Sequence, residues 1–401
     1  MPSFSRLNVN LVRSLIVCIT CLMLLLTANS LPVALANGTS ARTPFLVQAN
    51  WPMFGFFASH DHYNFYENVL SPANVSKLTL DWNSTVGGND NSSPVVYQGI
   101  VYSSSSNALE ALDATTGALK WSYPIAGYGS PAVGNGVIYV SSNKTLDALN
   151  GTTGALLWSY TVTDQYGIST SITFINNVVY FGTGSALYAL DATAGALKWR
   201  YAVNCINGIF STPAVASGIV YFDTGCEFDA LNAKTGTFLW KDATSGFAAS
   251  SPAVANGMVY YLFSYYLRAL DATTGALKWQ HSFPKSRSLL PYSSPAVANG
   301  IVYIGVELRL YALNATTGKP LWNFITGKQI ISSPSVANGV VYIGSEDHSI
   351  YAMNATAGTL LWHYMTGGTI YESSPTVVNG MVFINSADNK LYAFHLPGKN
   401  S

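Results

Sequence analysis

The 401-residue sequence contains little charge. Lys, Arg, Asp and Glu make up 9% of it, against roughly 25% in a typical soluble domain. Basic and acidic residues balance at 19 each, so neither sign gathers as a nucleic acid or an anionic membrane would require. The sequence also lacks a G-x-S-x-G nucleophile motif and a glycine-rich phosphate loop ending in lysine. We therefore expect no nucleic-acid partner, and polar contacts made mainly by Ser, Thr, Asn and Tyr.

Long apolar runs are missing except for one near the N-terminus. Residues 15–26 are apolar, Arg6 and Arg13 precede them, and Ala34-Leu35-Ala36 follows. This order is typical of a secretory signal peptide. The run is shorter than the roughly 20 residues that span a bilayer, although an uncleaved anchor is the alternative. We predict a signal peptide over 1–36, cleaved after Ala36. The mature chain would have no membrane span and would be secreted or extracytoplasmic, at the cell surface or in the periplasm.

Cysteine is scarce as well. Cys18 and Cys21 lie inside the predicted signal peptide, which leaves Cys205 and Cys226 in the mature chain. An exported protein meets oxidising conditions, so a remaining pair favours a disulfide. The alternative is two independent buried thiols.

The sequence is rich in one repeated motif. Its skeleton is Ala-x-(Asp/Asn)-x-x-x-Gly-x-x-x-Trp, shown clearly by residues 269–279. Seven copies end at Trp121, Trp158, Trp199, Trp240, Trp279, Trp322 and Trp362. An eighth tryptophan, Trp82, stands 39 residues before Trp121 without the upstream half of the motif. Nearly the whole chain is therefore one unit of about 40 residues, repeated.

Each unit predicts four short antiparallel strands. In the unit that starts at Ser250, Asn256-Gly257 is a strong hairpin signal because both positions accept positive φ. The second turn has an Asx residue at the strand end and Gly275 where a left-handed conformation is needed. A four-stranded meander of this length predicts a β-propeller blade.

Counting the tryptophans gives an all-β, eight-bladed propeller over residues 51–397. Residues 37–50 would form a flexible leader and residues 398–401 a tail. The last unit, residues 373–394, has only three predicted strands and lacks a tryptophan strand. We expect residues 78–86, which carry Trp82, to supply the missing strand and close the ring.

The motif resembles the tryptophan-docking motif of the pyrroloquinoline quinone (PQQ) propellers, over roughly residues 51–395. The resemblance implies that eight structural tryptophans lock adjacent blades together: Trp82, Trp121, Trp158, Trp199, Trp240, Trp279, Trp322 and Trp362. This family includes quinoprotein alcohol dehydrogenases and the barrel-assembly lipoprotein of bacterial outer membranes. PQQ and Ca²⁺ come into consideration by this resemblance only, because the motif is structural and does not report a bound quinone. The family's dehydrogenases often carry a disulfide between adjacent cysteines, which this chain lacks.

A site is expected on the face where the units differ. The motif turns are near-identical, whereas the strand 4–1 and strand 2–3 connections on the other face vary. Cys205 and Cys226 both fall on that face at one blade edge, which favours the disulfide. Aromatic residues precede the innermost strands and would ring the channel mouth as a stacking surface for a planar or sugar ligand: Tyr128, Tyr166, Phe210, Phe247, Tyr292 and Tyr371. Packing against neighbouring blades is the alternative for these side chains.

The sequence does not identify a set of catalytic residues. A Ca²⁺–quinone site needs Glu, Asn and Asp converging with a base, and Lys285, Arg287 or Lys328 could supply the base, but no spacing selects them. Catalytic and cofactor-binding residues thus stay unassigned. His60-Asp61-His62 is a weak metal candidate beside the alternative of a solvated loop.

We therefore expect a secreted, monomeric, non-catalytic binding or scaffold module whose partner is a small molecule, a glycan or a protein. The alternatives are a PQQ- and calcium-dependent dehydrogenase of alcohols or sugars, and an envelope protein-assembly factor. The latter is disfavoured because Cys18 and Cys21 lack the small preceding residue of a lipoprotein site.

Overall fold

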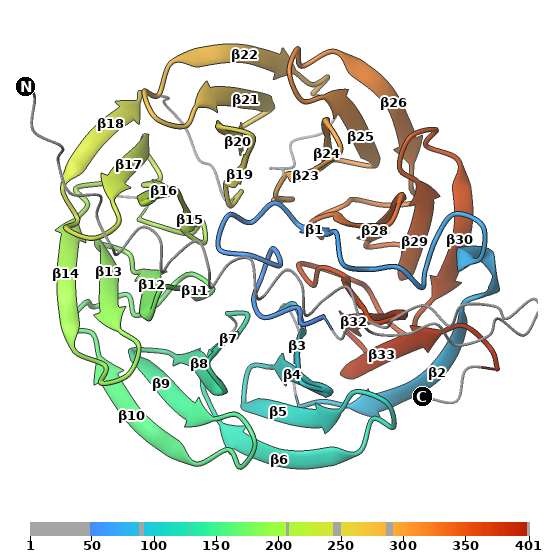
Figure 1. Ribbon diagram of the computed structural model, residues 1–401, viewed down its shortest axis with the longest axis horizontal. Helices are drawn as coiled ribbons and strands as arrows, with labels where there is room; N and C mark the ends of the chain where they lie inside the picture. Colours follow the sequence, from blue (N-terminus) through green and yellow to red (C-terminus); the bar gives the residue numbers. More distant parts are fainter. Residues whose placement is uncertain are drawn as a thin grey trace, which may run out of the picture. The chain divides into compact units, whose positions relative to one another are not determined.

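Eight β-sheets follow one another around a central channel in the computed structural model (Figure 1). It describes residues 49–87, 92–127, 129–205, 208–243, 250–285 and 292–398, all within one compact unit. The predicted signal peptide and nearly all of the predicted leader lie outside these residues. The described ranges contain one helix, the 3₁₀ turn η1 (Val75–Lys77), which is far too short to cross a membrane.

Seven blades consist of four strands that are consecutive in the chain, each paired antiparallel with the next. Blades one to four contain β3 (Val95–Tyr97), β4 (Ile100–Ser104), β5 (Ala108–Asp113), β6 (Leu119–Pro124); β7 (Ala132–Gly134), β8 (Val137–Ser142), β9 (Thr145–Asn150), β10 (Leu156–Thr161); β11 (Thr173–Ile175), β12 (Val178–Gly182), β13 (Ala186–Asp191), β14 (Leu197–Ala202); and β15 (Ala214–Ala216), β16 (Ile219–Asp223), β17 (Phe228–Asn232), β18 (Phe238–Asp242). Blades five to seven contain β19 (Ala253–Ala255), β20 (Met258–Phe263), β21 (Tyr266–Asp271), β22 (Leu277–Ser282); β23 (Ala296–Ala298), β24 (Ile301–Val306), β25 (Arg309–Asn314), β26 (Pro320–Ile325); and β27 (Ser335–Ala337), β28 (Val340–Gly344), β29 (Ser349–Asn354), β30 (Leu360–Met365).

The eighth blade joins the two ends of the propeller. Its order is β31 (Thr376–Val378), β32 (Met381–Ser386), β33 (Lys390–His395) and then β2 (Thr79–Thr85), which places Trp82 opposite Ala393. The innermost strands contact one another all the way round, from β3 through β31 and back to β3. The predicted fold class, an eight-bladed all-β propeller closed by an N-terminal strand, is confirmed.

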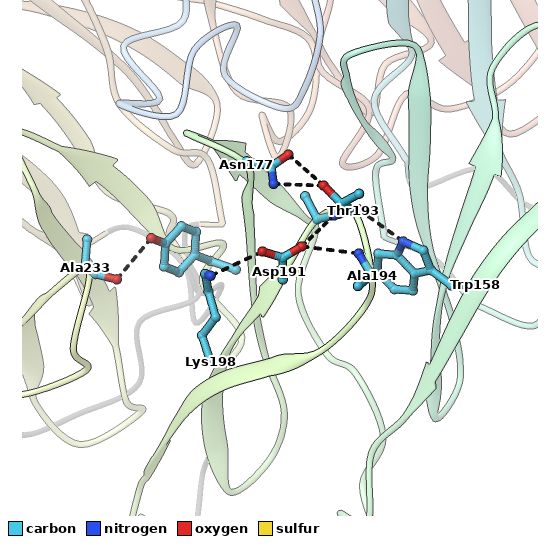
Figure 2. A network of polar contacts seen from close by, with 9 residues as sticks. Trp158, Asn177, Asp191, Thr193, Ala194, Lys198 and Ala233 are labelled. Atoms are coloured by element: carbon cyan, nitrogen blue, oxygen red, sulfur yellow. Dashed lines mark hydrogen bonds and ion pairs between the residues drawn. The ribbon is translucent and has the colours of Figure 1, made fainter.

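A tryptophan latch joins each blade to the next. The indole N–H of every outer-strand tryptophan donates to a backbone carbonyl of the following blade, and Figure 2 shows the latch of Trp158. The donor–acceptor distances are 2.9–3.3 Å for Trp82–Ala114, Trp121–Gly151, Trp158–Ala192, Trp199–Ala233, Trp240–Ala272, Trp279–Ala315, Trp322–Ala355 and Trp362–Leu78. In the second blade, the hydroxyl of Tyr139 donates to the same carbonyl of Ala192 as Trp158 does.

The packing of this latch explains why the glycine and the Asp or Asn of the motif recur in the repeats. Gly195 has φ 67°, and a Cβ at this residue would lie 2.6 Å from Cε3 of Trp158, so only glycine fits beneath the indole. The carboxylate of Asp191 accepts the N–H groups of Thr193 and Ala194 and shapes the turn (Figure 2). Seven of the motif glycines receive a tryptophan from the preceding blade in this way: Gly117, Gly154, Gly195, Gly236, Gly275, Gly318 and Gly358.

The N-terminal part of the propeller occupies part of the channel. Residues 49–78, which we call the plug segment, run through the centre of the ring before they reach the outside as β2 (Figure 1). Innermost-strand N–H groups donate to its carbonyls at 2.6–2.8 Å, in the pairs Val133–Pro52, Val215–Ala58, Val254–Ser59, Val297–Asp61 and Val336–His62. Trp51 exchanges two bonds with Val96, β1 (Tyr63–Asn64) lies parallel to β27, and the Asn64 amide donates to Val377. In the third blade, the hydroxyl of Thr173 is hydrogen-bonded to Nε2 of His60 at 3.2 Å.

The plug segment closes the channel on the side of the Asn-Gly hairpin turns. The amide N–H of Ala49 donates to Asn379, Asn338 donates to Leu70, and the carboxylate of Glu67 accepts the N–H of Gly380. His60 and His62 are 1% and 0% exposed, so the solvated loop considered for this stretch is wrong. Burial lowers the pKa of both imidazoles to about 3, and among the described residues no group of three or more His, Cys, Asp or Glu side chains is placed to hold a metal ion.

Candidate functional site

The opposite face of the ring contains a cavity of about 740 Å³. Phe54 of the plug segment lines it, together with residues from the connections that lead into the innermost strands. Since the plug segment closes the other side of the channel, we place the opening of this cavity, the funnel, on the face of the variable connections. Its volume lies within the range of small-molecule sites, roughly 300–1,000 Å³.

A ring of hydroxyl groups surrounds the funnel at one level. It consists of the residue before the first-strand proline of each blade, or before Ile172 in the third blade: Ser93, Ser130, Ser171, Thr212, Ser251, Ser294, Ser333 and Ser374. Seven of these residues line the cavity. In seven of the eight junctions, the backbone N–H of one member donates to the hydroxyl oxygen of the member in the next blade, at 2.8–3.1 Å. Because each of these oxygens accepts a backbone N–H, its own proton can be donated to another acceptor, as the Ser374 hydroxyl donates to the carbonyl of Glu372.

The repeated Ser-Ser-Pro sequence now has a physical explanation. The first hydroxyl accepts an N–H from the second strand of its own blade, as in Ser293 with Gly305, Ser332 with Gly344 and Ser373 with Asn385. The second hydroxyl belongs to the ring and bonds to the neighbouring blade. The pattern was visible in the sequence, but the separate tasks of the two serines were not.

Five blades also contribute a variable residue to the described wall of the funnel. The residue three positions before the first-strand proline lines the cavity at Ser169, Phe210, Tyr292, Ile331 and Glu372, with Ile172 taking the place of the proline in the third blade. The same sequence position is Asn91, Tyr128 and Ala249 in the other blades, outside the described residues. We call these eight positions the variable ring.

The predicted aromatic residues divide into three groups. Tyr166, Phe210 and Tyr292 line the funnel with exposed fractions of 67%, 47% and 37%. Tyr371 is 41% exposed but does not line the cavity. The buried Ile370 stands five residues before its proline, whereas Ile209 and Ile330 stand four before theirs. The segment between the buried isoleucine and the proline is thus one residue longer in this blade. As a result, Glu372 and not Tyr371 stands three residues before the proline, in the variable ring. Tyr128 and Phe247 lie outside the described residues.

Tyr166 has the most exposed ring of this set and the most closely fixed surroundings. A Cβ at Gly184 would lie 2.6 Å from the Cδ2 atom of Tyr166, so the aromatic ring rests directly on the glycine backbone. The N–H of Tyr166 donates to Asp164 at 2.9 Å, and the other carboxylate oxygen of Asp164 accepts the hydroxyls of Thr183 and Ser185. Burial alone would raise the pKa of Asp164, but hydrogen bonds from Ser185 and Thr183 outweigh it and the pKa is lowered.

Charge is nearly absent from the funnel wall. Among the described lining residues, Glu372 is the one charged side chain. It is reachable from the cavity, and the surrounding protein displaces enough solvent to raise the pKa of its carboxyl. Lys285 lies instead over the ring of Tyr265 at 5.4 Å, Lys328 does not line the cavity, and Arg287 is outside the described residues.

These residues do not fit PQQ. The quinone carries three carboxylates, which call for cationic partners, and its calcium ion calls for converging oxygen ligands with several carboxylates. The described funnel wall has no Lys or Arg and a single carboxylate.

The structure contains the predicted disulfide between Cys205 and Cys226, with the Cα atoms 6.0 Å apart. It ties the connection between blades three and four to the turn between β16 and β17. Asp223 and Asp229 lie buried beside this turn, and burial raises the pKa of each to about 7. Neither side chain lines the funnel.

Comparison with known proteins agrees with the fold. A family model described as outer membrane protein assembly factor BamB matches residues 79–227, 206–305 and 264–399. Among solved structures, a quinohemoprotein alcohol dehydrogenase from Pseudomonas putida HK5 is similar, with a TM-score of 0.76 and 16% identity, covering 88% of this chain and 81% of that one.

A europium-containing methanol dehydrogenase has a TM-score of 0.74 and 15% identity, over 86% of this chain and 98% of that one. BamB from Moraxella catarrhalis has a TM-score of 0.67 and 19% identity, over 79% and 99%. No curated protein sequence matches. At such identities the structures show a shared fold alone. The family model covers well over half of the sequence, and the chain therefore belongs to the PQQ-like repeat family of β-propellers that this model describes as outer membrane protein assembly factor BamB.

Proposed function

We propose that this chain is an extracytoplasmic, non-catalytic binding module that holds its ligand in the funnel. The observation that supports this proposal is the layered construction of the cavity. The plug segment closes one side, a hydroxyl ring of constant chemistry surrounds the channel, and the five described positions of the variable ring each supply a different side chain. The hydroxyl ring would form a rigid pocket of constant chemistry, and the variable ring would determine which ligand binds, since a few well-placed groups determine specificity in a preformed pocket.

A PQQ- and calcium-dependent dehydrogenase is the main competing function. Its support is the shared fold with quinohemoprotein and methanol dehydrogenases, and the nearly uncharged funnel wall counts against it.

A role as an envelope protein-assembly factor is the second candidate. It is supported by the family description, which names assembly at the outer membrane, and that description also supports the extracytoplasmic location. In this case a protein partner would bind the variable face, and the chain should co-purify with a membrane protein from native envelopes.

The experiment that separates these functions uses the chain purified from a secreting host. Thermal unfolding is measured with and without PQQ and Ca²⁺, and dye-linked oxidation is assayed with a panel of alcohols and sugars. We expect no shift in melting temperature and no turnover with the quinone. A stabilisation of several degrees together with turnover would overturn the binding-module proposal. Stable co-purification with an envelope protein would favour the assembly role instead.

A further inference from the structure

We infer that the ligand of the funnel is a short neutral glycan, stacked on Tyr166 and hydrogen-bonded by the hydroxyl ring. This inference rests on the proposed binding function and names the chemical class of the ligand. Three independent features of the funnel lead to it: an aromatic platform, a wall almost without charge, and many hydroxyl groups.

The platform is the first feature. The ring of Tyr166 rests on Gly184, yet the residue as a whole is 67% exposed and lines the cavity, so we infer that the ring face away from the glycine is available to a ligand. The buried carboxylate of Asp164 fixes the backbone of Tyr166 and also binds the neighbouring turn through Thr183 and Ser185. An exposed aromatic ring that is held in place binds an apolar face with little loss of conformational entropy. The C–H face of a pyranose ring has this character.

The charge of the wall is the second feature. The described lining residues include one carboxylate and no cation, so an anionic ligand would lose hydration without gaining an ionic partner. This disfavours acidic sugars, nucleotides and PQQ, and favours a neutral compound. Ser169 and Ile331 of the variable ring show that positions facing the ligand need not be charged.

The hydroxyl groups are the third feature. A serine hydroxyl that accepts a backbone N–H keeps one proton to donate and one lone pair to accept with. Seven members of the hydroxyl ring line the cavity, and six of them, all but Thr212, have oxygens that accept a backbone N–H from a neighbouring blade. Sugar hydroxyls both donate and accept, so this ring matches them in chemistry. A peptide is the competing ligand, because its amides could use the same hydroxyls, but it would not need the flat platform.

The test is a binding experiment with the full chain on immobilised neutral oligosaccharides, acidic oligosaccharides, a peptide library and PQQ with Ca²⁺. Hits are then measured in solution by calorimetry. We expect binding of neutral oligosaccharides, lowered at least tenfold by Tyr166→Ala. Tyr66→Ala is the matched control, since Tyr66 is 44% exposed and belongs to the plug segment, and it should leave the affinity unchanged. Ile331→Arg adds a cation to the variable ring and should admit a uronic-acid oligosaccharide that the unmodified chain rejects.

The outcomes separate the inference from the function on which it rests. Peptide binding that depends on Tyr166, without glycan binding, overturns the glycan inference and leaves the binding module standing. Glycan binding that is insensitive to Tyr166→Ala, while the variant keeps its melting temperature, overturns the assigned site. Failure of glycans, peptides and quinone alike to bind overturns both, and quinone binding with turnover does so as well.

Discussion

The two faces of this propeller are built from opposite ends of the same strands, and they differ in what the repeats keep constant. On the latch face, every junction joins a tryptophan of one blade to a backbone carbonyl of the next, with glycine under the indole at seven of them. On the funnel face, the described positions of the variable ring are Ser, Phe, Tyr, Ile and Glu. The latch residues repeat because each junction between blades needs the same packing of an indole against the next blade. Variation on the second face, above a constant hydroxyl ring, is the difference on which the proposed binding function rests.

The two faces also treat carboxylates differently. Asp113, Asp191 and Asp271 of the motif turns accept turn N–H groups and pair with Lys120, Lys198 and Lys278 at 3.0–3.2 Å. The pKa of these aspartates is lowered. On the funnel side, burial raises the pKa of Asp223 and Glu372, with Asp164 as the exception.

The largest expected effect comes from adding a methyl group to the latch. Gly275→Ala places a Cβ 2.6 Å from Trp240 at φ 73°, and should cost about 3 kcal/mol from backbone strain and overpacking. Gly257 has φ 74° with nothing within 4 Å of the added atom, so Gly257→Ala should cost only about 1 kcal/mol. Urea denaturation of both variants measures the difference. Equal losses would show that the indole can move aside, and that the latch is not rigid.

Removal of the disulfide tests how the funnel face is held. Cys205 and Cys226 are 21 residues apart in sequence, and closing a loop of this size stabilises by roughly 2–3 kcal/mol. The Cys205→Ser/Cys226→Ser chain should lose that amount in urea denaturation, and reducing agent should destabilise the original chain but not the variant. A variant as stable as the parent would mean that the latch alone holds blade four.

Asp223→Asn should change the pH dependence of stability. The folded pKa of about 7 lies above the ordinary value, so the carboxyl stabilises the fold below about pH 4, and this contribution is lost as the pH rises through 7. The variant should therefore gain roughly 2 kcal/mol relative to the parent between pH 5 and pH 8. The amide can keep the 2.6 Å bond from Gly225.

Asp271→Asn on the latch face is the control for this prediction. Its hydrogen bonds lower the pKa of the carboxyl to about 2, so its contribution is present above about pH 4 and is lost as the pH falls through 2. Melting temperatures measured from pH 2 to pH 9 should thus move in opposite directions for the two variants. The same direction for both would contradict the division between the two faces.

The smallest effect concerns a paired exchange between motif copies. Copies with Asp carry Lys before the tryptophan, whereas copies with Asn (150, 232, 314 and 354) carry Leu there (157, 239, 321 and 361). Asp113→Asn and Lys120→Leu should each cost under about 1 kcal/mol, as expected for an exposed pair. The double variant should recover part of the loss, and a double-mutant cycle measures it. Strictly additive losses would mean that the two positions are not coupled.

The fold could be predicted from the sequence because each blade contains the same turn and tryptophan signals at the same spacing. Seven tryptophans at regular spacing, Asn-Gly turns and the orphan Trp82 predict the blades, their number and the closing strand. The plug segment could not be predicted, since Trp51 to Asn64 occurs once and has no period that would reveal its backbone contacts. Its buried His60 and His62 carry polar side chains that a sequence reading assigns to solvent.

The candidate site was less predictable for a related reason. The aromatic residues before the innermost strands pointed to the funnel, but a single additional residue after Ile370 exchanges Tyr371 for Glu372 at its wall. Such a shift is invisible without the buried isoleucine that fixes the register. The support of Tyr166 by Gly184 and Asp164 joins residues about 20 positions apart through side-chain contacts that no local pattern encodes.

The contacts between the N-terminal segment and the last blade also affect how the protein folds. The part of the propeller that is synthesised first holds every blade together at the centre and completes the last sheet, through contacts as distant in sequence as Ala49 with Asn379. The bond between Ala49 and Asn379 and the pairing of β2 with β33 can form only when the final strands exist, whereas Trp51 can already pair with Val96 of the first blade. Long-range closure of this kind slows folding. A chain shortened at its C-terminus would leave β2 without its partner strand β33, and Ala49 without Asn379.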